Sequence, residues 1–461
     1  MTVSSTRTSR ADDYPAAVRE LTSRGRFGIS LGLQRIEAIL DELDHPERSL
    51  HGALVGGTNG KGSVVAMARS VLRAAGLRIG TMPKPHLVSY RERIAIDGLP
   101  LDEERFAAAV ARVLPATDRV AERLGPPTEF ETLTAAAFTE LAVSDVDLVL
   151  VEVGMGGRLD ATNVLDPGVA LITNVQLDHE RYLGRTLAAI GAEKAAIIKR
   201  GDLAVTGATG RGLRPIVDRA AELATPLRLA GPGHPYGAEL RHAGWDGLVV
   251  DAATPDSTLR GLRIGLLGGH QAQNAAVALA LLDALRQDGE RRGAPLIGLD
   301  ESATRRGFAD ARWPGRMELL PATAHGRVLL DGAHNPAGAR ALAAALGELD
   351  LRGFPLVFGA MRGKRVTAVL RALAPLQPKP IFTRVADAVV DAGARSPESL
   401  LAAWRRVAGD ASAGRTASEP GEAMRQAAAW RTDDEQPIVV AGSLYLVGAV
   451  RARLMGEEAP T

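Results

Sequence analysis

Short apolar runs alternate with amphipathic stretches along much of the chain. The runs have the length and composition of β-strands, and the stretches that follow them carry apolar residues at helical spacing. This alternation predicts an α/β fold in which parallel sheets are flanked by helices. Functional side chains in such folds gather at the carboxyl ends of the strands. The expected strands span residues 54–56, 147–153, 168–175, 327–331, 355–359 and 437–441.

The length of the chain predicts more than one domain. Its 461 residues exceed the usual size of a single domain, and a hydrophobic content of 46% is enough to fill two cores. A helical segment ends near residue 311, and Pro314-Gly315 interrupts the chain before a new series of strands. We therefore expect one domain over residues 1–311 and a second over residues 312–461.

Charge and composition narrow the class of partner. The formal net charge is +1 and the charged residues are mixed, so the basic stripe of a nucleic-acid-binding protein is absent. No run of about 18 apolar residues suggests a membrane span. The chain has no cysteine, which excludes disulfides and thiolate metal sites. We expect a cytoplasmic protein, in the simplest case a monomer, that binds small molecules and neither nucleic acid nor membranes.

Lysine is rare in this chain. Among 55 basic residues, 49 are arginine and only six are lysine. Where surface charge is normally supplied by arginine, each lysine is a candidate for chemistry that a guanidinium cannot perform, although some can be incidental. The lysines stand at positions 61, 84, 194, 199, 364 and 379.

A glycine-rich segment between the first strand and an amphipathic helix predicts a phosphate-binding loop. Glycines allow a tight turn that aims backbone N–H groups at phosphate, and the helix adds its positive amino end. The match to the general pattern is imperfect: Val55 stands at the first glycine position and Gly62 separates the lysine from the serine. A structural glycine-rich turn is the alternative. The expected nucleotide ligands are Gly57, Thr58, Asn59, Gly60, Lys61, Gly62 and Ser63, with Lys61 on the β- and γ-phosphates and Ser63 facing magnesium.

A carboxylate follows the second long apolar run. Residues 146–151 have the composition of a buried strand, and Glu152 ends it. A carboxylate at this edge of the sheet is suited to a magnesium ion bound to the nucleotide. With the glycine-rich loop, it indicates a site for a nucleoside triphosphate.

Lys194 falls on the apolar stripe of a helix expected over residues 186–199. A buried ammonium is costly unless it is paired or neutralised. Lys194 could pair with an acidic residue such as Glu152, or it could react with carbon dioxide to give a carbamate that binds magnesium. His179, just before this helix, could be a metal ligand or a capping residue.

The C-terminal part offers a second group of polar residues. Asp331 and His334 follow the strand expected at 327–331, where Asn335 can cap the next helix. Arg316 could reach a nucleotide from the linker, or it could be a solvated loop arginine. Asn274 lies near the start of an alanine-rich helix, where a capping or core role is the alternative to ligand binding. Ser443 stands at another transition from strand to helix.

Together these motifs resemble the folylpolyglutamate synthase and dihydrofolate synthase family of the Mur ligase superfamily. The resemblance covers most of the chain in the family's order. Besides the glycine-rich loop, it rests on Lys84-Pro85-His86-Leu87, Glu92-Arg93-Ile94, Thr128-Glu129-Phe130-Glu131, residues 152–163, Asp178-His179, Glu193-Lys194-Ala195, residues 270–274, Pro314-Gly315-Arg316, residues 331–336 and residues 442–445.

The resemblance implies a nucleotide-binding N-terminal domain, a smaller Rossmann-like C-terminal domain, and ATP and Mg²⁺ as cofactors. It implies an acyl phosphate made from a folate-type carboxylate and ATP, which the amine of glutamate then attacks. It assigns catalysis to Lys61, His179, Lys194, Asp331 and His334, and the metal to Ser63, Glu152, His179 and a carbamylated Lys194. Asn274, Arg316, Asp331 and His334 would approach ATP or complete the site between the domains, while Phe130 lies in a segment associated with the pterin substrate. We add Lys84, His86 and Ser443 as candidates for substrate contact.

Three departures from the family pattern affect the expected site. Lys84 stands where a serine that helps to bind magnesium is usual, and an ammonium cannot ligate a cation. We therefore expect Lys84 to contact phosphate or a substrate carboxylate. Residues 363–365 and 394–396 also differ from the usual sequences.

Two other functions compete with this reading. A ligase of peptidoglycan precursors would carry a UDP-binding domain before the loop, and only 56 residues precede Gly57. A nucleotide-dependent regulatory protein would have no need for an inward-facing Lys194 beside His179. The sequence does not separate dihydrofolate synthase from folylpolyglutamate synthase activity, and we expect both.

Overall fold

The computed structural model describes residues 11–25, 32–385, 393–409 and 413–456. The chain divides into two compact units, and neither is continuous in sequence. Unit 1 comprises Met1–His86, Tyr90–Ala230 and Val277–Thr304, and unit 2 comprises Leu87–Ser89, Gly231–Ala276 and Arg305–Thr461. The boundary expected between residues 311 and 312 stays a prediction.

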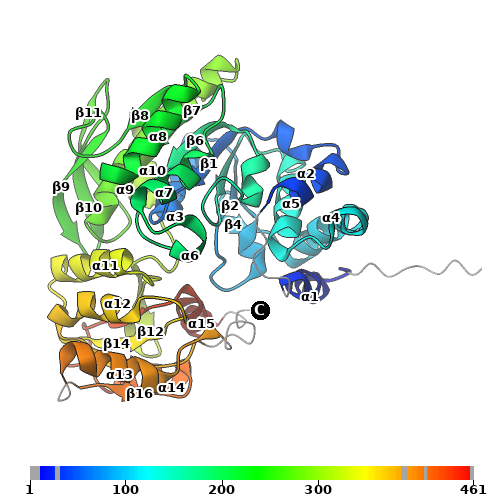
Figure 1. The fold of residues 1–461 in the computed structure, drawn as a ribbon. Helices are drawn as coiled ribbons and strands as arrows, with labels where there is room; N and C mark the ends of the chain where they lie inside the picture. The colour runs from blue at the N-terminus through cyan, green and yellow to red at the C-terminus, as the bar shows by residue number, and fades with distance from the viewer. Residues whose placement is uncertain (1–10, 26–31, 386–392, 410–412, 457–461) are drawn as a thin grey trace, which may run out of the picture. The chain divides into compact units, whose positions relative to one another are not determined.

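Unit 1 is built on an eight-stranded sheet (Figure 1). Its order is β4-β3-β2-β5-β1-β6-β7-β8, and every neighbouring pair is parallel except those that involve β3 and β4. The strands are β1 (Gly52–Gly56), β2 (Ile79–Met82), β3 (Ala95–Ile96), β4 (Leu99–Pro100), β5 (Leu148–Glu152), β6 (Gly168–Ile172), β7 (Leu203–Thr206) and β8 (Leu227–Leu229). β1 and β5 lie at the centre, and every residue in them is buried.

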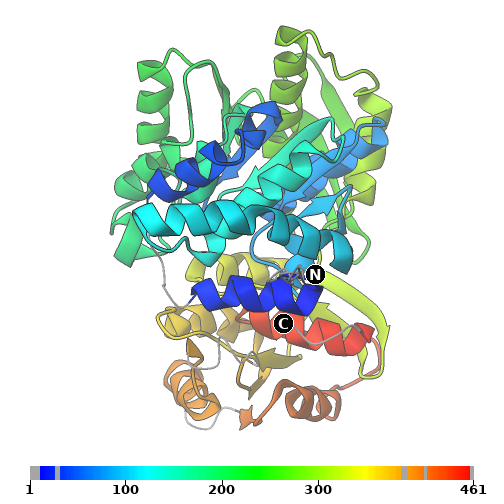
Figure 2. The same ribbon diagram turned by 90° about the vertical axis from the view of Figure 1, so that its right-hand side faces the viewer.

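Helices cover this sheet because its strands are apolar on both faces. α4 and α5 pack against each other (Figures 1 and 2), and residues of both helices share one apolar core with Leu54, Val149 and Val151 of the strands. α5 begins with a capping box between Thr128 and Glu131. The helices that belong wholly to unit 1 are α1 (Tyr14–Gly25), α2 (Gln34–Asp41), α3 (Lys61–Ala74), α4 (Glu103–Leu124), α5 (Glu129–Ala142), α6 (Glu180–Leu183), α7 (Leu187–Ala195) and α8 (Gly210–Glu222).

Unit 2 contains a six-stranded sheet of order β12-β13-β17-β14-β15-β16, which is parallel except for the β12–β13 hairpin. Its strands are β12 (Glu318–Thr323), β13 (Gly326–Leu330), β14 (Pro355–Phe358), β15 (Lys379–Phe382), β16 (Arg415–Thr416) and β17 (Ile438–Ala441). Its helices are α11 (Pro336–Glu348), α12 (Val366–Leu373), α13 (Pro397–Ala408), α14 (Pro420–Ala428) and α15 (Leu444–Met455). A separate antiparallel sheet joins β9 (Gly237–Gly244), β10 (Gly247–Ala253) and β11 (Thr258–Ile264).

Alternation along the strands divides the core of unit 2 into two layers. In β13, Leu329 packs into the core that contains α11, α12 and α13, while Val328 and Leu330 pack into the core that contains α14 and α15. This follows from the two-residue period of a strand, because neighbouring side chains point to opposite faces. Helices on both faces of a mainly parallel sheet confirm the predicted α/β class.

Two helices cross the division between the units. α9 (His270–Arg291) begins in unit 2 and ends in unit 1, and α10 (Glu301–Asp310) runs the other way. Within the described residues, no helix is long and apolar enough to cross a membrane.

Candidate active site

The glycine-rich loop connects β1 to α3 and depends on glycine at its first position. Gly57 has a φ of 138°, and a Cβ built there would lie 1.9 Å from the Thr173 hydroxyl. No other residue fits without moving the neighbouring strand end. Gly60 has a φ of 81° and precedes the first turn of α3. The amino end of α3 therefore faces the loop, as a phosphate site requires.

Polar residues after β6 hold this loop in place. The Asn59 amide donates to Asn174 Oδ1 at 3.0 Å, and its carbonyl accepts bonds from Thr173 Oγ1 at 2.7 Å and Asn174 Nδ2 at 2.9 Å. Asn59 Nδ2 also donates to Gln176 Oε1 at 2.7 Å. Sequence reasoning missed these residues. The signal that could have found them is the change from apolar to polar residues at the end of a central strand.

Lys61 curls back over the loop that it follows. Its ammonium donates to the Gly57 carbonyl at 3.0 Å and to the Thr58 carbonyl at 3.5 Å. The charge is therefore held above the backbone that would surround a phosphate.

Glu152 ends β5 beside this loop. In the register of the central strands, Glu152 pairs with Val55 of β1, and its side chain is almost completely buried. Glu152 thus lies at the carboxyl edge of the sheet, next to the strand that leads into the loop.

Lys84 follows β2, on the other side of β5. Its ammonium lies 3.6 Å from the centroid of the Phe130 ring and 4.0 Å from Asp160 Oδ1. The side chain is 6% exposed, and burial lowers the pKa of Lys84 to about 7. The charges of Asp160 and Glu152 oppose this shift, whereas those of Arg93 and Lys61 add to it. Asp160 was not singled out by sequence reasoning.

Lys194 lies in the last turn of α7 and is buried, as its place on the apolar stripe predicted. Burial is the main cause that lowers its pKa to about 7, and repulsion by Lys61 adds to it. Asp178 and Asp160 act in the opposite direction. In the described part of the chain, no ion pair joins Lys194 to Glu152. The helix is shorter than expected and ends at Ala195. Lys199 lies beyond it, and its ammonium donates to the Asn163 side chain and the Leu165 carbonyl.

His179 precedes α6 in the left-handed conformation, with a φ of 50°. Its ring is half exposed, and Nε2 lies 4.0 Å from Asp178 Oδ2. Among the described residues, no three His, Asp or Glu side chains form a ready-made metal site. The donor types of Glu152, His179 and Ser63 still suit a hard divalent cation. A charged Lys194 would oppose such an ion, whereas a carbamate on Lys194 would add anionic oxygens.

His86 is held as a neutral ring. Its Nδ1 accepts a hydrogen bond from Arg93 Nε at 2.9 Å, and its ring centroid is 4.3 Å from that of Tyr90. Burial and the Arg93 charge lower the pKa of His86 to about 3. The proton of the neutral ring must therefore be on Nε2, which becomes a hydrogen-bond donor.

Unit 2 contains the other predicted site residues. Asp331 is buried and accepts hydrogen bonds from the backbone amides of Met317 at 3.0 Å and Ala333 at 2.9 Å. Burial raises the pKa of Asp331, and the charge of Arg316 acts against this. His334 Nδ1 lies 2.9 Å from the Gly332 carbonyl and must donate to it. Arg316 and Asp331 therefore belong to one electrostatic group.

The remaining predicted residues of unit 2 are buried near helix starts. Asn274 Nδ2 donates to Gln271 Oε1 at 2.8 Å within α9. Ser443 immediately precedes α15 and does not cap it with its side chain. Asn335 caps α11 through a 2.8 Å bond from the Gly338 amide, which confirms the predicted cap.

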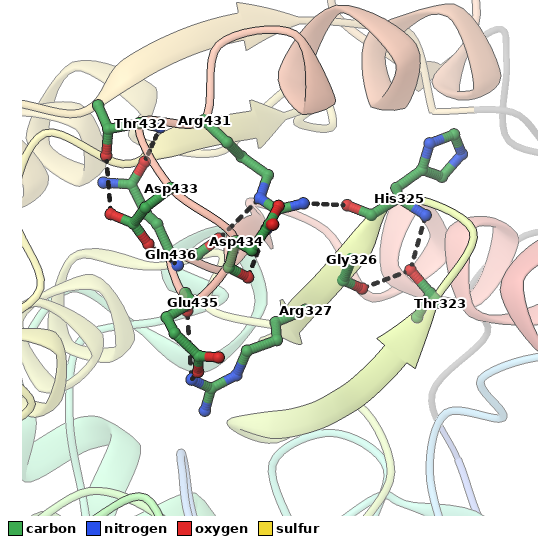
Figure 3. Close-up of polar contacts among 10 residues, drawn as sticks. All are labelled: Thr323, His325, Gly326, Arg327, Arg431, Thr432, Asp433, Asp434, Glu435 and Gln436. Carbon is green, nitrogen blue, oxygen red and sulfur yellow. Dashed lines mark hydrogen bonds and ion pairs between the residues drawn. The ribbon is translucent and has the colours of Figure 1, made fainter.

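A hollow of about 450 Å³ in unit 2 is lined by Arg327, Arg431 and four neighbouring residues. Gly326 and Arg327 begin β13, whereas Asp331 follows the opposite end of this strand. Figure 3 shows the polar contacts around the two arginines. The Arg431 guanidinium donates hydrogen bonds to the backbone carbonyls of His325 (3.2 Å), Gln436 (3.1 Å) and Asp434. Arg327 pairs with Glu435 at 2.8 Å. Arg327 and Arg431 already bind groups of the protein that stabilise the β12–β13 hairpin. We therefore do not regard this hollow as an active site.

Two family models match the chain. The Mur ligase middle domain matches residues 55–282, and the C-terminal domain of dihydrofolate synthetase matches residues 319–454. The chain is 32% identical to the dihydrofolate synthase/folylpolyglutamate synthase of Bacillus subtilis, over 96% of this chain and 99% of that protein.

Solved structures of similar proteins agree with this match. A Mycobacterium tuberculosis folylpolyglutamate synthase complexed with ADP and AMPPCP superposes with a TM-score of 0.86 at 32% identity, covering 97% of this chain and all of that one. The bifunctional folylpolyglutamate synthase/dihydrofolate synthase of Yersinia pestis, complexed with AMPPNP and a Mn ion, gives a TM-score of 0.80 at 29% identity. Coverage is again 97% of this chain and 100% of the other.

Proposed function

Because the chain belongs to the folylpolyglutamate synthase and dihydrofolate synthase family, we propose that it joins L-glutamate to the carboxylate of dihydropteroate and of reduced folates. It is an ADP-forming acid–amino-acid ligase. The observation that carries the proposal is the convergence of the phosphate loop with Glu152, Lys84 and Lys194 at one edge of the unit 1 sheet.

The residues of unit 1 suggest how the first step proceeds. Backbone amides of residues 57–63 and the Lys61 ammonium would bind the phosphates of ATP and draw charge from the γ-phosphate. A carboxylate oxygen of the acceptor then attacks the γ-phosphorus, the bond to the ADP oxygen breaks, and an acyl phosphate forms. The amine of glutamate attacks the acyl carbon and loses a proton as inorganic phosphate leaves. Ser63, Glu152 and His179 would hold a Mg²⁺ ion, which supplies further charge neutralisation at the phosphates.

Lys194 would complete the metal site as a carbamate. The amine adds to the carbon of CO₂, a C–N bond forms, and one proton is released to leave an anionic N-carboxylate. Support comes from the burial of Lys194 and from its pKa of about 7, which leaves a reactive neutral amine near neutral pH. Enzyme prepared with ¹³C-bicarbonate should show one carbamate ¹³C resonance that is missing in Lys194→Gln. Retention of that resonance in the variant would refute the assignment.

His86, Phe130 and Ser443 would contact the organic substrates. The neutral His86 ring can donate through Nε2 to a carbonyl or carboxylate oxygen, and the Phe130 ring offers an apolar surface beside Lys84. In unit 2, Arg316, Asp331, His334 and Asn274 would approach ATP. We also propose that the enzyme works as a monomer in the cytoplasm, which light scattering and cell fractionation would test.

The function is tested by following ADP formation with ATP, Mg²⁺ and glutamate. Dihydropteroate is offered in one reaction and tetrahydrofolate in another, and the product masses are measured. Glutamate-dependent turnover of both supports a bifunctional synthase, and turnover of one alone assigns a single specificity. ATP binding without turnover of either acceptor would overturn the proposal.

A further inference from the structure

We propose that the Lys84 ammonium binds the reacting carboxylate of the acceptor substrate and presents it to the γ-phosphate of ATP. This inference rests on the proposed function and names one residue that recognises the acceptor. It concerns a position where this chain differs from the usual family sequence.

The first observation is that Lys84 is buried without satisfied donors. An ammonium has three N–H donors. In the part of the chain that the structure describes, Lys84 Nζ is buried and makes no hydrogen bond. Its ion-pair partner is Asp160, whose Oδ1 lies 4.0 Å from Nζ, too far for a hydrogen bond. A buried ammonium in this state is costly to the fold, and a bound anion would remove that cost.

The second observation explains why Asp160 does not fill this role. Asp160 Oδ1 accepts bonds from the amide of Thr162 at 3.1 Å and from its hydroxyl, and Oδ2 accepts from the Met155 amide at 2.8 Å. Its oxygens are therefore committed to the loop after β5. Asp160 provides charge that keeps an ammonium in place, while the donors of Lys84 stay available for a ligand.

The third observation is that Gly154 packs closely against the group formed by Lys84, Asp160 and Phe130. A Cβ built on Gly154 would lie 2.9 Å from Asp160 Oδ2, 3.3 Å from Phe130 Cζ and 3.6 Å from Lys84 Cδ. Any larger residue at position 154 would push into this group. The Phe130 ring packs on the ammonium at 3.6 Å and fixes one side of it.

The order of the strands favours a carboxylate over a phosphate of ATP as the ligand. The loop follows β1, Glu152 ends β5 and Lys84 follows β2, and these strands are adjacent in the order β1, β5, β2. Neighbouring strands are about 4.8 Å apart, so Lys84 follows a strand two positions, about 10 Å, from β1. Lys61 already serves the phosphate loop. The Lys84 ammonium, on the other side of Glu152, is suited to bind the other anion of the reaction, which is the carboxylate of the acceptor.

The chemistry requires such a cation. The attacking carboxylate and the γ-phosphate are both anions, and bringing them together is unfavourable unless positive charge lies between or beside them. Lys84 would donate to the acceptor carboxylate and keep its proton throughout the phosphoryl transfer. A bound carboxylate also favours the charged form of the amine.

The test compares Lys84→Met with Lys84→Arg, and uses Lys379→Met as a control. Lys379 lies in unit 2, where its ammonium donates to the Trp430 carbonyl at 3.3 Å, so the control makes the same chemical change elsewhere. We measure the KM for the acceptor, the KM for ATP and the thermal midpoint of each protein. Lys84→Met should raise the acceptor KM by about 30-fold or more while the ATP KM changes by less than about 3-fold. Its thermal midpoint should rise, because an unsatisfied buried ammonium is removed.

Lys84→Arg should recover part of the acceptor affinity, because it keeps the charge. A rise in the ATP KM with an unchanged acceptor KM would overturn the proposal in favour of a phosphate contact. Unchanged constants for both substrates would assign Lys84 a structural role only. Absence of turnover by the unaltered enzyme with either acceptor would refute the proposed function, and this inference with it. If Lys84→Met did not fold, the proposal would be tested with Lys84→Arg alone. A change in the acceptor KM without a change in the ATP KM would support the proposal, and the reverse would overturn it.

Discussion

Lys84 and Lys194 are buried amines, and burial lowers the pKa of each to about 7. The positive charge of Lys61 contributes to the lowered pKa of both, so Lys61 is linked electrostatically to two of the other five lysines. Lys199 and Lys379 instead donate to backbone carbonyls. The scarcity of lysine therefore drew attention to Lys61 and the two amines that it repels, and to two lysines that bind backbone carbonyls; the roles of the first three in the reaction stay predictions.

The lowered pKa of Lys84 predicts a particular dependence of stability on pH. The fold disfavours the charged amine, so this group lowers stability near pH 7 and stops doing so as pH rises towards 10.5. The ligand-free protein should therefore be less stable than Lys84→Met at pH 7, and the difference should narrow by pH 10. Thermal midpoints of both proteins across this range provide the measurement. Both proteins contain Lys194, so its contribution to the pH dependence drops out of the difference in stability. A constant difference would contradict the lowered pKa.

Gly57→Ala should strongly weaken nucleotide binding. The new Cβ would lie 1.9 Å from Thr173 Oγ1 at a φ of 138°, so the loop must move. We expect the Kd for ADP to rise by about 100-fold, measured by calorimetry. Gly347→Ala in α11 is the matched control. Its Cβ meets nothing within 4 Å, so it should leave ADP binding unchanged and stabilise the fold by about 0.5 kcal/mol.

Among the elements, the β12–β13 hairpin depends on one guanidinium. Arg431 satisfies carbonyls of the hairpin and of the segment before β17, and a Cβ at Gly326 would lie 2.1 Å from its Nη1 (Figure 3). Arg431→Met should lower the free energy of unfolding by about 2–4 kcal/mol, because the two partly buried carbonyls of His325 and Gln436 lose their donor. Urea denaturation would measure this.

The control for Arg431 is Arg214, which pairs with Asp218 on the exposed surface of α8. Arg214→Met should change stability by less than about 0.5 kcal/mol. Equal effects of the two variants would show that Arg431 is not a structural clamp.

Periodicity predicted the strands well because a buried strand needs a continuous apolar run. The runs at 54–56 and 355–359 coincide with most of β1 and β14. The expected helix over 186–199 was too long, because its apolar pattern continues through Ile197 and Ile198 although α7 ends at Ala195. Both isoleucines are buried outside a helix, and periodicity alone cannot distinguish that case.

The site was predictable where a motif is local and not where it depends on pairing between distant strands. The loop at 57–63 is a continuous segment, whereas Asp160 approaches Lys84 only because β2 and β5 are neighbours. Thr173 and Asn174 reach Asn59 through the register of β1 with β6. A single sequence does not provide that register.

At the scale of the whole molecule, ligands should stabilise the fold that contains their site. ADP with Mg²⁺ at about 100 times its Kd should add about 2.7 kcal/mol to the free energy of unfolding. Differential scanning calorimetry would record this as a higher thermal midpoint. The gain should be lost in Lys61→Ala, whose ammonium would otherwise contact phosphate. A full gain in that variant would remove Lys61 from the nucleotide site.

Leu87–Ser89 belongs to unit 2, although His86 and Tyr90 on either side of it belong to unit 1. The Leu87 carbonyl packs so closely on α15 that a Cβ at Gly448 would lie 1.7 Å from it. During synthesis, Leu87 leaves the ribosome long before α15, which begins only at Leu444. We therefore expect the segment that follows Lys84 and His86 to become ordered only once α15 has emerged, so that nascent chains acquire ligase activity late.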